Sequence, residues 1–275
     1  MVEKKASLQR NLGTGIIGVL NAAVGVIVVF ISREMARRID WIMGRRGYAP
    51  EDEKQFTGNQ LMILKKAAGE VQFLLDRGYD VKPVTTFVGN HYMLSERQRL
   101  ALARSISPAE WVKKRNSKEL LQKQEKAFPE IIHIDGFNTV ITLEVALSGS
   151  PVFVCRDGAI RDLAGLRGTY RIIDQTQKAI ELILRQLESL KIEKACFYLD
   201  APVSNSGRLS LLIRQCAQRS GVSAEVQIIP DVDRVLEKME GVVSGDAIIL
   251  NRCASWLNMM PEIVEQIDPV WKIQL

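Results

Sequence analysis

The chain has 275 residues, of which 47% are hydrophobic and 25% are charged, so it carries enough apolar sequence for a sizeable core and is not typical of a disordered protein. Its formal net charge of +5 suits an anionic partner, either nucleic acid or lipid headgroups. The 4 cysteines are widely spaced and only 2 histidines are present, which argues against a disulfide framework and against a zinc site. Polar chemistry in this chain must therefore depend mainly on carboxylates.

The amino-terminal segment, residues 1–46, contains a long apolar run without charges. Residues 12–32, LGTGIIGVLNAAVGVIVVFIS, would span about 31 Å as a helix, close to the thickness of the hydrocarbon core of a membrane. We expect a transmembrane helix here, with a buried core helix or a non-native extension as the alternatives. More basic residues follow the run than precede it, so the positive-inside rule predicts a cytoplasmic domain anchored to the inner face of the cell membrane.

The middle region, residues 47–128, is predicted to be a small basic helical module. Residues 58–77 place apolar side chains at helical spacing and predict an amphipathic helix. Residues 81–90 are expected to be extended and to end in a turn. Two further helices are expected to begin at capping sequences, one at Ser95 and one at Ser107.

Basic side chains of this module could form a surface that contacts the phosphates of a nucleic acid. A solvated helix surface is the alternative, and it is the more frequent origin of such a charge run. The candidate nucleic-acid-binding residues are Arg97, Arg99, Arg104, Lys113, Lys114 and Arg115.

From residue 129 to residue 275, strand-like and helix-like segments alternate, which predicts an α/β domain with a three-layer parallel sheet. The strands are expected at residues 131–135, 152–155, 194–199, 224–229 and 246–250. Their near-continuous apolar character agrees with a sheet that is covered on both faces. No glycine-rich nucleotide-binding loop follows any of them, so neither a dinucleotide site nor a P-loop is expected.

Acidic residues recur at the ends of these predicted strands. Because the carboxyl ends of parallel strands lie along one edge of a sheet, acids far apart in the sequence can meet there. Mg²⁺ or Mn²⁺ takes such oxygen ligands and can activate water for phosphodiester hydrolysis. Aspartate is also common where ordinary loops begin, so each acid has a structural alternative. The candidate catalytic residues are Asp135, Asn138, Asp200 and Asp246, and Asp231 and Asp233 are further candidate metal ligands.

The loop that follows residue 155 combines acids with arginines. Asp157 and Asp162 are expected to be loop and capping residues. The arginines of the loop, among them Arg156 and Arg161, could contact a phosphate group.

Two parts of the chain resemble known families. The stretch from about residue 46 to residue 107, with RGYAPED, LLDRGY and TTFVGNHYMLSERQRLALARS, resembles the archaeal family catalogued as domain of unknown function 434. That family is uncharacterised, so this resemblance implies no activity. It does imply that similar chains begin near RGYAPED, which would make the hydrophobic leader an addition.

The carboxyl-terminal part resembles the companion domain of that family and, more distantly, the PIN-like and NYN nucleases. The resemblance lies in IDGFN at residues 134–138 and SGD at residues 244–246. It implies a PIN-like fold with a metal site in which Asn138 is a site residue and Asp135, Asp200 and Asp246, with Asp231 or Asp233, are ligands. Related nucleases often carry a second acid and an aromatic residue after SGD, whereas AII follows it here.

The leading hypothesis is a Mg²⁺- or Mn²⁺-dependent endoribonuclease. Asp135, Asp200 and Asp246 would bind the ion that activates water, and the basic helical module would hold RNA. The alternative from another class is a non-catalytic RNA-binding or scaffold protein with structural aspartates. A phosphatase that uses the same acidic edge on a small phosphate ester is a third possibility.

Overall fold

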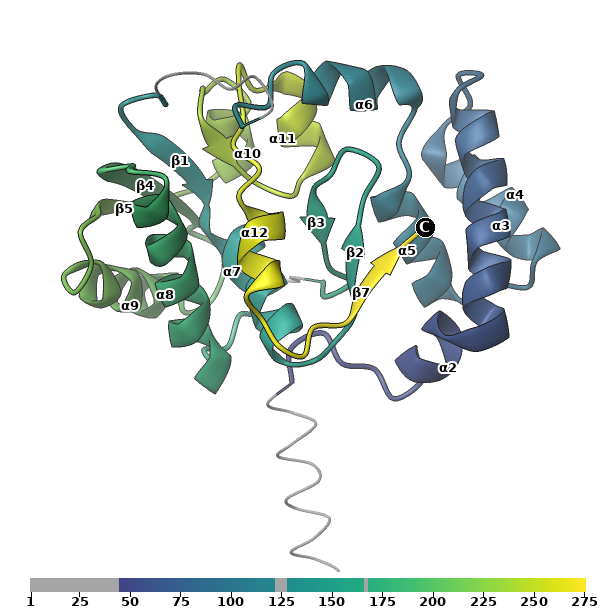
Figure 1. Cartoon of the computed structure of the whole chain (residues 1–275), viewed down its shortest axis with the longest axis horizontal. Coiled ribbons are helices and arrows are strands. Elements are labelled where there is room, and N and C mark those ends of the chain that lie inside the picture. Colours follow the sequence, from purple (N-terminus) through teal and green to yellow (C-terminus); the bar gives the residue numbers. More distant parts are fainter. Residues whose placement is uncertain (1–44, 122–127, 166–167) are drawn as a thin grey trace, which may run out of the picture. The chain divides into compact units, whose positions relative to one another are not determined.

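The computed structural model describes residues 45–121, 128–165 and 168–275 (Figure 1). The expected transmembrane helix at residues 12–32, with nearly all of the leader, lies outside the described residues. No helix within the described ranges is long and apolar enough to cross a membrane.

The first part of the described chain is helical, as the sequence predicts for the middle region (Figure 1). Its helices are α2 (Asp52–Phe56), α3 (Gly58–Leu75), α4 (Val81–His91), α5 (Glu96–Ser105) and α6 (Ala109–Asn116). The capping box expected at Ser95 is confirmed, because its hydroxyl accepts a hydrogen bond from the main-chain N–H of Gln98 at 3.1 Å and the Gln98 side chain accepts one from that of Ser95 at 3.0 Å. The prediction of a second capping box at Ser107 is wrong. Pro108 is the N-cap of α6, and the hydroxyl of Ser107 accepts from Arg115 instead.

Residues 81–90 form α4, so the extended stretch expected there is wrong. Their β-branched residues favoured a strand, but Val84 and Val88 lie one helical turn apart and are buried in the core of the helical part. Pro83 falls in the first turn of α4, where the missing N–H costs no helical hydrogen bond. Packing of one apolar face thus outweighs the local preference of these residues.

The carboxyl-terminal part contains a four-stranded parallel sheet with the order β5-β4-β1-β6. Its strands are β1 (Ile132–Asp135), β4 (Lys194–Asp200), β5 (Ser223–Ile229) and β6 (Val242–Val243). The helices of this part are α7 (Gly136–Leu147), α8 (Asp174–Ser189), α9 (Ser206–Ala217), α10 (Val232–Leu236), α11 (Ala247–Arg252) and α12 (Met260–Glu265).

Helices cover both faces of this sheet. Successive side chains of a strand point to opposite faces. In β4, Phe197 is buried in one cluster with residues of α7, α8 and α9, whereas its neighbour Tyr198 is buried in another with residues of α10 and α11. The predicted mixed α/β fold with a parallel sheet is therefore confirmed, including the strands expected at 131–135, 194–199 and 224–229.

Two of the expected strands are not in this sheet. Residues 152–155 contribute to a separate three-stranded sheet of order β3-β2-β7. Its strands are β2 (Val152–Val154), β3 (Ile160–Arg161) and β7 (Lys272–Gln274). Residues 246–250 were expected to be a strand and instead open helix α11, because the Asp246 carboxylate caps it by accepting from the main-chain N–H of Ile248 at 2.6 Å.

The small sheet packs into two cores at once. Val152 is buried among the helices of the parallel sheet, and its neighbour Phe153 is buried among those of the helical part. The Phe153 ring meets that of Phe56 edge-on, with 5.3 Å between centroids. Arg45–Leu275 accordingly forms one compact unit, in which the expected ranges 47–128 and 129–275 share part of their core.

Candidate functional site

The order of the parallel sheet creates a crevice at the carboxyl ends of β1 and β6. Within this sheet, β4 and then β5 are added on one side of β1, and β6 is added later on the other side of β1. The direction of winding therefore reverses between β1 and β6. Ligands of open α/β sheets bind at such a switch point. Asp135 ends β1, and Ser244 directly follows β6 and donates its hydroxyl hydrogen to the Asp135 carboxylate at 2.8 Å.

A cavity of about 510 Å³ opens at this crevice, and five aspartates line it. Four of them, Asp135, Asp200, Asp233 and Asp246, are metal ligands predicted from the sequence, and the fifth is Asp162. Asn138 lines it as well, so the structure brings together all four candidate catalytic residues and one of the two further candidate ligands. Asp231 is not among the lining residues. It is exposed and caps α10, where its carboxylate accepts from the main-chain N–H of Arg234 at 3.1 Å.

Local hydrogen bonds fix several of these side chains. The Asp135 carboxylate caps α7 and accepts from the main-chain N–H of Asn138 at 3.4 Å. The Asn138 side-chain oxygen in turn accepts from the main-chain N–H of Gly245 at 2.7 Å, which joins the start of α7 to the loop after β6. Asp200 accepts from the main-chain N–H of Val232 at 3.3 Å.

Burial and like charge act together on these carboxylates. Burial raises the pKa of Asp135 to about 7, and the charges of Asp233 and Asp246 add to the shift while the hydrogen bond from Ser244 opposes it. Burial also raises the pKa of Asp233, and repulsion from Asp246 and Asp200 raises it further. The pKa of Asp200 is raised by burial as well. Among the described residues, no arginine or lysine forms an ion pair with any of the four. A bound cation would therefore relieve their repulsion.

The donor set suits a hydrated Mg²⁺ or Mn²⁺ better than a fully protein-ligated metal. Within residues 45–121, 128–165 and 168–275, no group of three or more His, Cys, Asp or Glu side chains is arranged so that it could hold a metal ion. Mg²⁺ usually keeps several waters and is bound through one or two carboxylates together with substrate phosphates. Carboxylate oxygens in a shared cavity match that mode of binding.

The cavity lining also includes Arg104, which the sequence predicts as a nucleic-acid-binding residue, and Asp162 and Thr142, which the sequence does not predict as site residues. Asp162 is buried and accepts hydrogen bonds from the hydroxyl of Thr142 and from the main-chain N–H of Ala164, both at 2.7 Å. Arg104 forms an ion pair with Asp162 at 3.6 Å and also donates to its main-chain carbonyl. Thr142 lies four residues after Asn138 on α7, and that spacing could have indicated a shared helix face. Nothing in the sequence pairs Arg104 with Asp162.

Two protein families match the chain. Domain of unknown function (DUF5616) matches residues 125–262, and Protein of unknown function (DUF434) matches residues 63–118. The uncharacterized protein MJ0935 of Methanocaldococcus jannaschii is 35% identical over 189 residues, which are 69% of this chain and 89% of that protein. The chain belongs to the DUF5616 family, whose function is unknown. No solved structure matches it.

The family assignment confirms the resemblance to domain of unknown function 434 and its companion domain. The more distant resemblance to PIN-like nucleases stays a prediction. The cavity aspartates all lie within the DUF5616 match, whereas Arg104 comes from the DUF434 match.

The remaining basic candidates of the DUF434 match differ in how far they are free to bind a partner. Arg97 pairs with the buried Asp52, and Arg99 donates to the main-chain oxygens of Leu94 and Thr86 at 3.0 Å each. Arg115 is only 2% exposed and is held inside the protein. The donors of these arginines therefore serve the fold. The side chains that stay exposed are Lys113 and Lys114.

Proposed function

We propose that this protein is a Mg²⁺- or Mn²⁺-dependent ribonuclease that hydrolyses phosphodiester bonds in the cavity between β1 and β6. One observation carries the proposal: four aspartates without a basic partner among the described residues line a single cavity at the switch point of a parallel sheet. The IDGFN and SGD resemblance to PIN-like nucleases supports the same chemistry.

In this proposal the aspartates supply oxygen ligands, and the cation lowers their mutual repulsion. When bound, the ion supplies Lewis acidity and positive charge next to the phosphodiester. Asp135 is held by Ser244 and by the start of α7, which fixes its carboxylate toward the cavity. Arg104, which also lines the cavity, would contact a substrate phosphate, and the exposed Lys113 and Lys114 would contact the RNA backbone.

A catalytically silent RNA-binding or scaffold protein is the second candidate, and two observations favour it. No group of three acids in the described part of the chain is arranged to hold a metal. In addition, Asp135, Asp231 and Asp246 all cap helices, a role that needs no ligand. In a silent protein these aspartates would serve the fold alone.

Cleavage of an end-labelled RNA pool tests the proposal. The fragment of residues 43–275 is incubated with Mn²⁺ or with EDTA, beside Asp135→Asn and beside Asp174→Asn, an exposed aspartate at the start of α8 that does not line the cavity. We expect Mn²⁺-dependent cleavage that Asp135→Asn abolishes and Asp174→Asn retains.

Two other outcomes would contradict this proposal. RNA that is bound equally by the parent and by Asp135→Asn, without cleavage, would identify a silent binding protein. Mn²⁺-dependent hydrolysis of p-nitrophenyl phosphate without cleavage of RNA would identify a phosphatase.

A further inference from the structure

The loop that carries Asp246 is held at its main chain by two side chains from distant parts of the sequence. The N–H of Gly245 donates to Asn138, and the carbonyl of Gly245 accepts from Nε of Arg161 at 2.5 Å. A side chain at residue 245 would meet the Asn138 oxygen at 3.0 Å and the main-chain oxygen of Ile160 at 3.2 Å, so glycine permits this close approach. The path of the loop into the cavity is thus set from outside the loop.

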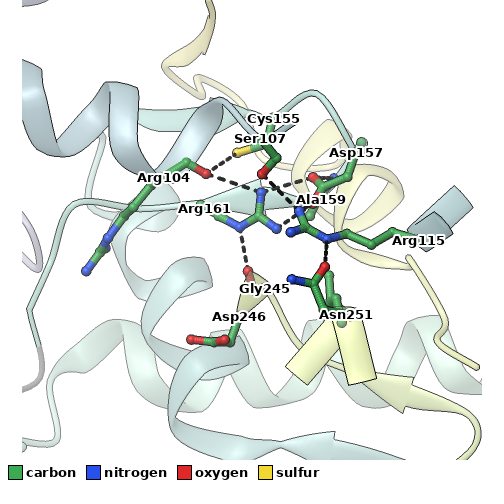
Figure 2. Close-up of polar contacts among 12 residues, drawn as sticks. Arg104, Ser107, Arg115, Cys155, Asp157, Ala159, Arg161, Gly245, Asp246 and Asn251 are labelled. Carbon is green, nitrogen blue, oxygen red and sulfur yellow. Dashed lines mark hydrogen bonds and ion pairs between the residues drawn. The ribbon is translucent and has the colours of Figure 1, made fainter. Parts of the chain in front are cut away.

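Arg161 has a buried guanidinium, and each of its three nitrogens donates at least one hydrogen bond (Figure 2). Besides Gly245, it donates to both carboxylate oxygens of Asp157, at 2.9 and 2.6 Å, and to the main-chain oxygen of Arg104 at 3.3 Å. Burial alone would raise the pKa of Asp157, but Arg161 and Arg115 outweigh it and hold that pKa below its ordinary value. The fork of Arg161 therefore sits in a fixed orientation on an ionised carboxylate.

Arg115 of α6 connects the same carboxylate to the helix that Asp246 caps. Its guanidinium donates to Asp157 at 2.6 Å and to the side-chain oxygen of Asn251 in α11 at 2.7 Å (Figure 2). Asp157 is thereby shared by Arg161, which holds the residue before Asp246, and by Arg115, which holds the helix after it. Both ends of the segment that presents Asp246 are braced through one buried ion cluster.

We propose that Arg161 is a positioning residue of the cavity, which acts with Asp157 and Arg115 to fix the loop of Gly245 and Asp246. The helical part of the chain then takes part in building the site, through α6, as well as in any contact with RNA. The catalytic consequence rests on the proposed function, whereas the placement of the loop does not.

Arg161→Lys is the informative variant, because it keeps the positive charge beside Asp157 but cannot donate to Gly245 and to both Asp157 oxygens in the same geometry. Arg46→Lys is the matched control. Arg46 also pairs with a buried carboxylate, that of Glu144 at 2.8 Å, and also donates to a main-chain carbonyl, that of Arg171. It does not line the cavity.

Amide hydrogen exchange of the full-length chain tests the placement without any assumption about the reaction. We expect exchange in residues 241–252 to be at least tenfold faster in Arg161→Lys and unchanged in Arg46→Lys. Equal exchange of this segment in the parent and in Arg161→Lys would overturn the proposal. If Arg161→Lys does not fold, Asn251→Ala takes its place, since it removes only the Arg115 partner in α11, and faster exchange confined to residues 241–252 is again expected.

RNA cleavage with a Mn²⁺ titration then tests the catalytic consequence. A misplaced reacting group costs about 10²-fold in rate, so we expect Arg161→Lys to lose about that factor in kcat and to need more Mn²⁺ for half-maximal activity. If kcat and the Mn²⁺ concentration for half-maximal activity are the same in Arg161→Lys as in the parent, Arg161 has no positioning role. If the parent chain cleaves no RNA, the proposed function fails, and the exchange experiment still decides whether Arg161 places the loop.

Discussion

At the scale of single residues, Asp135 is a carboxyl group whose surroundings disfavour its charge. It is 7% exposed, and the charges of Asp233 and Asp246 add to the effect of burial on its pKa. In the folded protein it holds its proton up to about pH 7, whereas in the unfolded chain it loses that proton near its ordinary pKa of about 4. Below pH 4 Asp135 carries its proton in both states and does not oppose folding. As the pH rises from 4 toward 7, the unfolded chain loses this proton and the folded protein keeps it, so the free energy of unfolding falls.

Asp135→Asn should consequently stabilise the metal-free protein at pH 8. Asparagine keeps the N-cap of α7 and can still accept the hydrogen bond from Ser244, but it carries no charge. We expect the free energy of unfolding in EDTA to rise by roughly 1 to 3 kcal/mol at pH 8, with little change at pH 4.5. Urea unfolding at both pH values measures this difference. A variant that is less stable than the parent at pH 8 would show that the charge of Asp135 is compensated.

The residues of the cavity differ in how far the sequence could indicate them. Asp135, Asn138 and Asp246 are recognisable because strand ends and helix caps are local features. The pairing of Asp162 with Arg104 is not, because the two residues meet only when α5 packs beside the loop that follows β3. No local pattern encodes that contact.

At the scale of elements, α11 shows how a cap and a candidate ligand can be one residue. Its sequence is apolar enough to favour a strand, yet Asp246 accepts from the main-chain N–H groups of Ile248 and Ile249, at 2.6 and 3.2 Å, and so begins a helix. The sequence predicts Asp246 at the sheet edge, and the structure has it in the cavity lining, but the predicted strand at residues 246–250 is wrong. A tertiary constraint, burial of Ile249 and Leu250 in the core beside β6, decides between the two.

Two substitutions of Asp246 should separate capping from cation binding. Asp246→Asn keeps a capping side chain, whereas Asp246→Ala loses it at a cost of about 1 kcal/mol in unfolding free energy. We expect both variants to bind Mn²⁺ more weakly than the parent, because both lose the carboxylate. Urea unfolding in EDTA and titration of Mn²⁺ by electron paramagnetic resonance give the two quantities. Parental Mn²⁺ affinity in Asp246→Asn would remove Asp246 from the ligand set.

At the scale of the whole described unit, the small sheet joins the helical part to the parallel sheet. Helices and strands could be predicted in sequence order, but the shared core could not, because it depends on how β2 and β7 pair across the length of the chain. Phe153 and Ile273, from those strands, are buried among residues of α3, α4 and α5. Removal of the helical part would expose these side chains to water.

A fragment of residues 129–275 should therefore fail to fold cooperatively, whereas residues 43–275 should unfold in a single transition. In the shorter fragment Phe153, Leu163 and Ile273 lose their apolar partners, at about 1.5 to 3 kcal/mol for each large side chain that becomes fully exposed, and Asp157 loses Arg115. Since domains are only marginally stable, that loss is comparable to the whole free energy of folding. Calorimetry and near-ultraviolet circular dichroism compare the two fragments. Cooperative unfolding of residues 129–275 alone would show that the parallel sheet is independent and that the helical part is an addition to it.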